Sequence, residues 1–391
     1  MDFSLHLVAA FDLTTLPQQL VNGLLNGAIY ALIALGYTMV YGVLKLINFA
    51  HGEVFMLGAY GALFVSWYLG YRPDGASPPA SYLTLILMLL GSMLVCTVAA
   101  FFIERFAYRP MRSQPRIASL ITAIGLSLLL QYSAQIFLLN GTPQTIQAGK
   151  LSPFVGNVTL NLRGPDQAKL DEAEKLKPSM TAAAAAFKAR LPLEKGEFDL
   201  SPEGKKLQEE MRVAERKYNE AVNAGTAHAV KIAIPKGQVV LFVTTIFLMA
   251  MLTYLVMFTK QGRAMRAVSH DFNAASLMGI NIDNVIVFTF LLGSALAGAG
   301  AMMYCTFIPG TKIDAFTGLT PGVKAFTAAV LGGIGNIPGA VLGGLVMGVA
   351  EYVVVWAGYD SYRDAIAFVI LIIVLLFHPG GLLGSSKVEK V

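Results

Sequence analysis

The chain has 391 residues, of which 55% are apolar and 14% are charged, and its mean hydropathy is +0.61. About a quarter of the residues of a typical soluble domain are charged, so this composition excludes an ordinary soluble globular protein. The net charge of +5 indicates the basic cytoplasmic anchors of a membrane protein rather than binding to nucleic acid.

Several apolar runs reach the ~18 residues that a helix needs to cross a ~30 Å hydrocarbon layer. We therefore predict an all-α polytopic membrane protein with about eight transmembrane helices, two discontinuous or re-entrant elements and a helical extracytoplasmic insertion. The predicted parts are an N-terminal transmembrane half, residues 1–139, a charged insertion, residues 140–236, and a C-terminal transmembrane half, residues 237–391. Residues 1–15 lack the basic region of a cleaved signal peptide, so the first apolar run is expected to remain as a helix.

The first apolar run, Val21–Leu44, is followed by a segment, Lys45–Tyr60, that carries a polar cluster between apolar sequences. The cluster contains Asn48, His51 and Glu53. Polar groups at membrane depth are costly and usually face protein or water, so one interpretation is a broken or re-entrant helix that lines or gates a translocation path. The alternative is a short cytoplasmic turn in which the histidine and the glutamate are solvated.

Further membrane passes are predicted at Tyr82–Ile103 and at Ile117–Leu139, with a strongly basic link between them. The link carries four arginines against one acid, Glu104. Short loops this basic lie on the cytoplasmic side of a membrane. The residues that follow the second of these passes are therefore expected outside, unless that pass is re-entrant.

Residues 140–236 differ in character, because about half of all charged residues fall in this quarter of the chain and long apolar runs are absent. Two segments rich in Ala, Glu and Lys, Asp166–Leu191 and Pro202–Ala224, predict helices with i,i+3 and i,i+4 pairs of opposite charge. Together they predict a small helical hairpin outside the membrane. It is interpreted either as a docking site for an extracytoplasmic partner or as a tolerated insertion.

The segment Lys260–Asn281 lies between two apolar runs, Val239–Phe258 and Val285–Phe307. Counting the passes places it on the same side as the arginine-rich link. Arg263 and Arg266 near its start predict a basic cytoplasmic loop.

A short helix is predicted inside this loop. Asp271 can cap its first turn, and Gly279 is a usual terminating residue. A helix of about two turns, ~10 Å long, would place Phe272, Ala275 and Met278 on one side. One interpretation is a knuckle with an apolar face that docks a cytoplasmic partner. The other is a solvated turn behind arginines that serve only as membrane anchors.

The link Ile308–Lys324 is predicted to be polar and irregular, and Ala325–Trp356 to be a helix interrupted by the sequence GGIGNIPG at Gly332–Gly339. Glu351 falls in the second part of this element, where it either faces a cavity or is paired inside the bundle. The last apolar run is Ala365–Phe377.

The broken elements Lys45–Tyr60 and Ala325–Val346 occupy matching places in the two halves, which predicts a repeat architecture with the translocation path between the halves. The side of the C-terminus stays open. Counting passes places it outside if Ala325–Trp356 crosses once, whereas the lysines in the terminal sequence SSKVEKV indicate the inside.

Several motifs are absent from the sequence. There is no G-x-x-x-x-G-K-[ST] phosphate loop, so the chain cannot be its own ATPase. No H-E-x-x-H or G-x-S-x-G motif is present, and the five histidines are scattered. Cys96 and Cys305 both lie inside apolar runs, which argues against a disulfide framework and a cysteine metal site. We expect neither enzymatic activity nor a cofactor.

Four stretches, in order, resemble the LivH-type permeases of branched-chain amino acid ABC importers. They are ALIALGYTMVYGVLKLINFAHGEVFMLGAY, IERFAYRPMRS, GRAMRAVSHDFNAASLMGIN and KAFTAAVLGGIGNIPGAVLGGL. The resemblance runs from about Leu20 to the C-terminus and leaves out Asn140–Lys236, where family members usually have a much shorter loop.

The resemblance implies a multi-pass subunit of the cell inner membrane that pairs with a second, related permease and two cytoplasmic ATPase subunits. A periplasmic binding protein would deliver leucine, isoleucine or valine. No nucleic acid is expected. The segment 260–281 would hold the coupling loop that seats in an ATPase groove, with the residues Gly262, Arg263, Arg266, Ala267, Asp271, Phe272, Ala274, Ala275, Leu277, Met278, Gly279 and Ile280. Candidates for the translocation path are Asn48, His51, Glu53 and Glu351.

Rival interpretations remain at this point. Related permeases for urea and short amides share these motifs, and other amino acids are further candidates for the cargo. A channel would need no ATPase, and an ion-coupled secondary transporter would need an ion or proton site such as Glu53 or Glu351.

Overall fold

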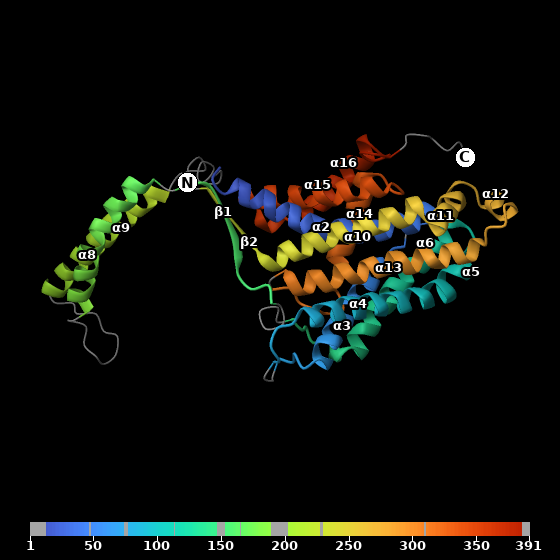
Figure 1. Cartoon of the computed structure of the whole chain (residues 1–391), viewed down its shortest axis with the longest axis horizontal. Helices are drawn as coiled ribbons and strands as arrows, with labels where there is room; N and C mark the ends of the chain where they lie inside the picture. The colour runs from blue at the N-terminus through green and yellow to red at the C-terminus, as the bar shows by residue number, and fades with distance from the viewer. Residues whose placement is uncertain are drawn as a thin grey trace. The chain divides into compact units, whose positions relative to one another are not determined.

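The computed structural model describes residues 13–46, 48–73, 77–112, 114–146, 153–164, 166–188, 202–226, 230–308 and 310–384. They form two compact units (Figure 1). The larger unit, which we call the bundle, contains the described residues of Gln19–Val158 and of Ile234–Val391. The smaller unit, which we call the hairpin unit, contains those of Asp12–Gln18 and Thr159–Ala233.

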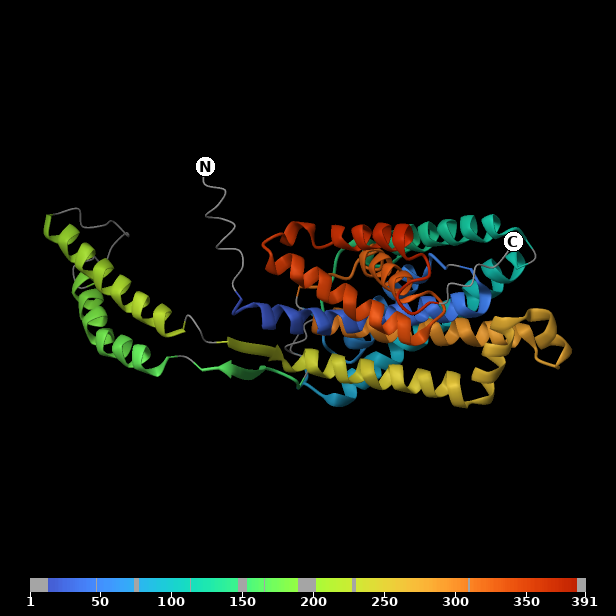
Figure 2. The ribbon, with the colours of Figure 1, turned by 90° about the horizontal axis from the view of Figure 1, so that it is seen from above.

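Most long helices of the bundle lie parallel or antiparallel to a common direction (Figures 1 and 2). Its α-helices are α2 (Leu16–Leu44), α3 (His51–Tyr68), α4 (Tyr82–Ile103), α5 (Arg109–Met111), α6 (Arg116–Phe137), α10 (Lys236–Phe258), α11 (Lys260–His270), α12 (Phe272–Leu277), α13 (Ile282–Phe307), α14 (Leu319–Gly332), α15 (Ile337–Trp356) and α16 (Ala365–Phe377). A π-helix joins α4 to α5 at Glu104–Tyr108, and 3₁₀ turns lie at Leu139–Gly141 and Asp360–Tyr362.

The expected class, an all-α polytopic membrane protein, is confirmed at this level. Six helices among the described residues are long and apolar enough to cross a membrane: α2, α4 with its extension to Met111, α6, α10, α13 and α15. About eight were expected. Two further bundle helices, α14 and α16, have only 14 and 13 residues, and the polar His51 and Glu53 lower the hydropathy of α3.

The hairpin unit contains the two helices that were predicted for the insertion. They are α8 (Gln167–Lys188) and α9 (Pro202–Thr226), while Leu191, the predicted end of the first, lies outside the described residues. The insertion also contains two strands that the sequence analysis did not predict. β1 (Asn157–Arg163) and β2 (Val230–Pro235) pair as a two-stranded sheet, because their alternating apolar residues favour strands.

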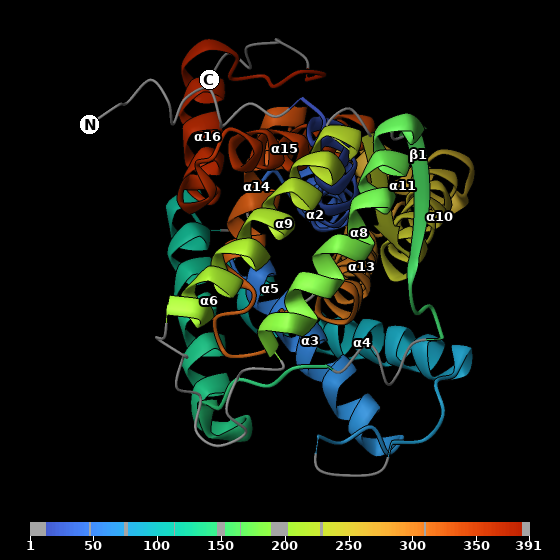
Figure 3. The same cartoon turned by 90° about the vertical axis from the view of Figure 1, so that its left-hand side faces the viewer.

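Glycines bring α2 and α15 into direct backbone contact, because small residues let two helices approach closely in lipid. A Cβ added at Gly27 would lie 2.7 Å from the carbonyl oxygen of Gly344, and one at Gly348 would lie 2.3 Å from the carbonyl oxygen of Gly23. Seen along the bundle, other helices surround α2, whereas α6 lies at the edge (Figure 3). In the most apolar 18-residue stretch of α2, 89% of the residues are buried, against 22% in the corresponding stretch of α6.

Both predicted helix breaks are present. α2 ends at Leu44, the next residue, Lys45, has a φ of +57°, and α3 starts at His51. α14 and α15 are separated by a turn in which Gly333 and Gly335 have φ values of +101° and +95°. Such angles suit glycine because it has no Cβ to clash. Asn336 then caps α15, accepting a hydrogen bond from the Gly339 N–H at 3.2 Å.

The predicted polar link Ile308–Lys324 was wrong in its second part. α14 begins at Leu319, and Lys324 lies inside this helix with 5% of its surface exposed. A lysine next to a proline and a glycine suggested an exposed loop, but ion pairs inside the bundle hold this side chain instead.

One end of the bundle carries α12, the two arginines Arg109 and Arg112, and the break between α14 and α15; we call it the arginine end. Both arginines pair with Asp283 in the first turn of α13, directly after the α12 segment. The prediction that the arginine-rich link and segment 260–281 share one side is therefore confirmed.

The last described residues also reach the arginine end. The Asn336 side chain donates a hydrogen bond to the Leu383 carbonyl at 2.7 Å. Gly335 of the same break lies beside Gly42, near the end of α2. The C-terminal segment therefore lies at the same end as the arginine-rich link. This is the alternative that the terminal lysines indicated, although Lys387 itself lies outside the described residues.

Candidate coupling surface and cavity

α11 folds back sharply against the end of α10, so the expected basic loop is a helix instead. Thr259 Oγ1 accepts a hydrogen bond from the Gly262 N–H at 3.1 Å, and the Arg266 guanidinium donates to the Val256 carbonyl. A Cβ at Gly262 would lie 2.2 Å from that carbonyl oxygen. Arg266 thus satisfies a carbonyl that the end of α10 leaves without an intrahelical donor. Arg263 is exposed.

α12 has the predicted start and stop. Asp271 Oδ1 accepts hydrogen bonds from backbone N–H groups two and three residues ahead, at 2.8 and 3.0 Å. Gly279 has a φ of +80°, and the N–H of Ile280 donates to the Ala275 carbonyl at 3.1 Å. This pattern is a Schellman motif, which fixes the C-terminal end of a short helix.

The exposed face of α12 differs from the predicted one. Ala275, which was expected to share a docking face with Phe272 and Met278, is 4% exposed and is turned into the bundle. The large apolar side chains that are free lie at the end of the helix: Leu277 is 88% exposed and Met278 is 82% exposed, with Phe272 at 37%. The prediction was wrong because it placed the three residues on one face from their spacing alone. Spacing does not show which side of so short a helix packs against the rest of the bundle. Of the other predicted coupling residues, Ala274 and Gly279 are exposed, Ala267 and Ile280 are half-buried, and Gly262 is buried.

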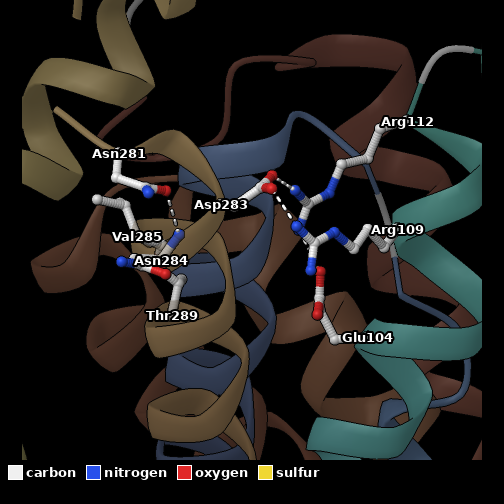
Figure 4. Close-up of polar contacts among 8 residues, drawn as sticks. All are labelled: Glu104, Arg109, Arg112, Asn281, Asp283, Asn284, Val285 and Thr289. Atoms are coloured by element: carbon white, nitrogen blue, oxygen red, sulfur yellow. Dashed lines mark hydrogen bonds and ion pairs between the residues drawn. The ribbon is translucent and has the colours of Figure 1, made fainter. Parts of the chain in front are cut away.

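A cluster of ion pairs joins the start of α13 to the π-helix and α5 (Figure 4). The Asp283 carboxylate binds Arg109 through Oδ2 and Arg112 through Oδ1. Arg112 also binds Glu104, whose side chain is fully buried. Asn281 caps α13 beside this cluster, accepting a hydrogen bond from the Asn284 N–H at 3.1 Å.

A cavity of about 180 Å³ lies where the first turns of α3 and α14 meet. These turns are in backbone contact, because a Cβ at Gly52 would lie 2.8 Å from the Gly318 carbonyl oxygen. The residues that line the cavity come from α2, the start of α3, α6 and α14: Tyr37, Phe49, Gly52, Glu53, Ile124, Ser127, Leu128, Gly318, Leu319, Gly322, Val323 and Phe326.

Of the predicted path residues, Glu53 lines the cavity. It is 2% exposed and accepts a hydrogen bond from Gln131 Nε2 at 3.3 Å. Asn48 and His51 are buried just outside the lining. Asn48 accepts a hydrogen bond from the Tyr108 hydroxyl at 2.6 Å, and the His51 ring lies 4.7 Å from the Tyr37 ring. The alternative of a solvated turn is therefore wrong.

Glu351 is not brought together with the other three. It belongs to a second cluster of ion pairs, in which Lys324 Nζ lies 2.7 Å from Oε1 and Arg363 Nε lies 3.3 Å from Oε2. The Tyr30 hydroxyl donates to Oε2 at 3.0 Å, and Lys324 also binds Asp364 at 2.6 Å. The cluster contains two acids and two bases, so its charges balance. Of the two alternatives for Glu351, pairing inside the bundle is therefore the one that the structure shows.

Sequence reasoning missed the partners in both clusters. Arg109 and Arg112 were used only to place their link on the cytoplasmic side, and Asp283 and Lys324 were given no partner. Their signal in the sequence is weak, since ion pairs between residues far apart in the chain leave no local spacing to detect. Two charges close to or inside apolar runs, Lys324 and Glu351, were the one available hint.

Comparison with known proteins agrees with this architecture. The family described as "Branched-chain amino acid transport system / permease component" matches residues 19–375. The chain belongs to this permease family. Its relatives include the high-affinity branched-chain amino acid transport system permease protein BraD of Pseudomonas aeruginosa, 36% identical over 96% of this chain and 97% of BraD. LivH of Escherichia coli K12, a permease protein described in the same words, is 34% identical over 96% of this chain and 97% of LivH.

A more distant relative has another cargo in its name. The autoinducer 2 import system permease protein LsrC of Escherichia coli O9:H4 is 30% identical over 34% of this chain and 40% of LsrC. No solved structure matches significantly. The permease is a multi-pass inner-membrane protein, and, as its family name says, it is one component of a transport system.

Proposed function

We propose that this permease is the membrane-spanning subunit of an ATP-driven importer for leucine, isoleucine and valine. Cytoplasmic ATPase subunits would power it, and a periplasmic binding protein would deliver the cargo. The family assignment and the names of BraD and LivH support this proposal. The same importer architecture with urea, short amides or other amino acids as cargo is the alternative that the experiment below must distinguish.

The chemistry of the cavity is the observation that carries the proposal for the substrate. One wall holds the carboxylate of Glu53 in the first turn of α3, which suits an ammonium group. Another part of the lining is the N-terminal end of α14, whose first turn contains no acid. The partial positive charge of a helix N-terminus favours a carboxylate. A zwitterionic amino acid could therefore satisfy both parts of the lining at once.

The rest of the lining is apolar. Ile124, Leu128, Val323 and Phe326 surround the remaining space, and the volume of about 180 Å³ exceeds the ~150 Å³ of a cavity known to bind benzene. A branched aliphatic side chain fits such a space, whereas urea would leave the apolar lining without contacts. The cavity therefore favours a branched-chain amino acid over urea.

The cavity opens on the surface of the chain, where several of its lining residues are exposed: Leu319 by 50%, Leu128 by 47% and Ile124 by 46%. A path used by a polar substrate cannot face lipid. We infer that the second permease subunit covers this side and that the translocation path runs between the two subunits.

The exposed end of α12 is the proposed contact with the ATPase. Arg109 and Arg112 lie at the same end of the bundle, and short basic loops mark the cytoplasmic side. Leu277 and Met278 lie there, outside the apolar spans and largely exposed. Exposed large apolar side chains with a polar surround are typical of an interaction site. Closure of the ATPase subunits would displace α12 and, through it, α11 and α13.

Glu351 argues against the rival ion-coupled mechanism. A proton or cation site needs a carboxylate that exchanges its partner during transport. Here the carboxylate is held by Lys324, Arg363 and Tyr30 together, so it is suited to a fixed structural role. No specific observation favours a channel.

The test is uptake by the complete transport complex in proteoliposomes, with the binding protein present and all ion gradients collapsed. Radiolabelled leucine, isoleucine and valine are compared with lysine, urea, propionamide and autoinducer 2. We expect ATP-dependent uptake of the three branched amino acids above all others, and none with ATPase-inactive partner subunits. Preferred uptake of urea, the amide or autoinducer 2 would contradict the assigned cargo, and uptake without ATP hydrolysis would contradict the importer.

A further inference from the structure

The cluster at the arginine end continues inward as a chain of contacts. Asp283 lies in the first turn of α13, four residues after Gly279 closes α12. Its two carboxylate oxygens each bind one arginine, and Arg112 connects it onward to Glu104. Exposure falls along this path, from 46% at the Asp283 side chain to 18% at Arg112 and 0% at Glu104. The contacts thus lead from the surface beside α12 into the interior.

Glu104 begins the π-helix, and Pro110 explains why this turn is wide. Proline lacks an N–H, and its ring would clash with the carbonyl four residues back in an α-helix. The chain widens instead, and the Arg109 N–H bonds to the Glu104 carbonyl five residues back. Glu104 and Tyr108 are the buried residues of this turn. Glu104 and Tyr108 therefore lie at the two ends of one π-turn, whose wide form the proline favours.

Tyr108 connects the π-helix to the entrance of α3. Its hydroxyl donates to Asn48 Oδ1 at 2.6 Å, and both side chains are buried. Its ring lies 5.2 Å from the ring of Phe290 in α13. The Asn48 carbonyl accepts the N–H of His51 at 3.2 Å, which forms the turn that starts α3.

The cavity begins at the next residue. Phe49 lines it, and its ring lies 5.7 Å from the ring of Phe326 on α14. Glu53 follows in the first turn of α3. A shift of Asn48 therefore moves two parts of the cavity wall together, the aromatic pair and the carboxylate.

We propose that Asp283, Arg112, Glu104, Tyr108 and Asn48 form a relay that transmits displacement of α12 to the wall of the cavity. Tyr108 and Asp283 are positioning residues: neither lines the cavity nor belongs to the exposed end of α12. The relay rests on the proposed function, since it needs a partner that moves α12. It adds that the force reaches α3 through side-chain contacts as well as through the backbone of α13.

Tyr108→Phe is the sharpest test, because it removes one hydroxyl and keeps the ring against Phe290. The variant is assembled into the complete complex in proteoliposomes, and leucine uptake and ATP hydrolysis are measured in parallel. The relay predicts normal assembly, near-normal ATP hydrolysis and an uptake per ATP that is lower by about fivefold or more, within the usual range of coupling between sites. Tyr71→Phe is the matched control, because it also removes a tyrosine hydroxyl bond, 2.8 Å to the Pro79 carbonyl. It is expected to keep the wild-type ratio.

Asp283 supplies a second, independent arm. Asp283→Asn removes the charge that holds both arginines, whereas Asp283→Glu keeps it. The relay predicts that uptake per ATP falls in the first variant and is largely restored in the second. A merely structural cross-link predicts instead that assembly, ATP hydrolysis and uptake fall together, with their ratio unchanged.

A wild-type uptake per ATP in Tyr108→Phe overturns the relay, as does a loss of assembly in both Tyr108→Phe and Asp283→Asn with an unchanged ratio in the complexes that form. Failure of the proposed function gives a different result, because wild-type complex would then show no ATP-dependent leucine uptake at all.

Discussion

Lys324 and Glu351 form an ion pair between α14 and α15, with 2.7 Å between Nζ and Oε1. Their side chains are 6% and 0% exposed. Both helices belong to the broken element of the second half, so the pair fixes α14 against α15 on the side of the break away from the arginine end. Removing one partner of a buried pair leaves an uncompensated charge and costs about 3–5 kcal/mol, whereas removing both costs much less.

We therefore predict that Lys324→Met lowers the thermal stability of the purified permease in detergent by several degrees or more. The double variant Lys324→Met with Glu351→Gln is expected to be the more stable of the two, because glutamine keeps a partner for Tyr30 and Arg363 without a charge. The measurement is a melting curve for each protein. Equal melting temperatures for wild type and Lys324→Met would contradict the buried-pair interpretation.

The contact between α2 and α15 gives a prediction about stability that does not involve charge. Gly27→Val would place side-chain atoms onto the backbone at Gly344, and overpacking of this kind costs about 1–3 kcal/mol or more. Gly125→Val is the matched control, because nothing lies within 4 Å of a Cβ at that position. We expect a lower melting temperature only for Gly27→Val. Equal effects of both substitutions would mean that the two helices do not meet at these glycines.

Glu53 gives a prediction about the substrate. Glu53→Gln keeps the size of the side chain and its bond to Gln131 but removes the charge proposed to hold the ammonium group. Hydrogen bonds to charged groups contribute about 1.5–3 kcal/mol, which corresponds to roughly a ten- to a hundredfold effect.

Leucine uptake at low substrate concentration is expected to fall by about that factor in Glu53→Gln, while ATP hydrolysis and assembly persist. Uptake at the wild-type rate would exclude Glu53 as the ammonium site and leave the importer intact.

Much of the fold could be predicted from the sequence because lipid imposes a simple rule of length and polarity. The bounds of α4 and α16 agree with the apolar runs Tyr82–Ile103 and Ala365–Phe377 residue for residue. The ends of α12 were also predictable, since Asp271 and Gly279 act within the helix they bound.

What escaped prediction depends on neighbours that are distant in the chain. The sequence contains no signal that turns Ala275 inward, nor one that pairs Arg112 with Asp283 across 171 positions. Lys324 was assigned to a loop from its local sequence alone. Its two ion-pair partners come from α15 and from the residues just before α16, which the local sequence does not reveal. The cavity was unpredictable for the same reason, because its lining comes from four separate helices and the turn before α3.

The exposed end of α12 gives a prediction about assembly. Leu277→Asp and Met278→Asp change side chains that are 88% and 82% exposed, so the permease alone is expected to fold and melt as the wild type does. Loss of an apolar anchor at the centre of an interface typically costs 2 kcal/mol or more. Copurification of the ATPase subunits is expected to fall accordingly.

Leu382→Asp is the control for that experiment, since this leucine is also an exposed apolar residue, 55% exposed, but does not belong to α12. It is expected to retain the ATPase subunits. Ala275→Arg is unsuited to the purpose, because Ala275 is buried and the substitution would test packing rather than docking.

The central claim is that a separate ATPase drives this permease through the free end of α12. The most direct measurement is leucine uptake by the complete complex in proteoliposomes, with ion gradients collapsed, for wild type and for the Leu277→Asp, Met278→Asp double variant at equal amounts of folded permease. We predict ATP-dependent uptake in the wild type and a loss of that uptake in the double variant, with Leu382→Asp unaffected. ATP-driven uptake that is unchanged in the double variant would contradict the claim.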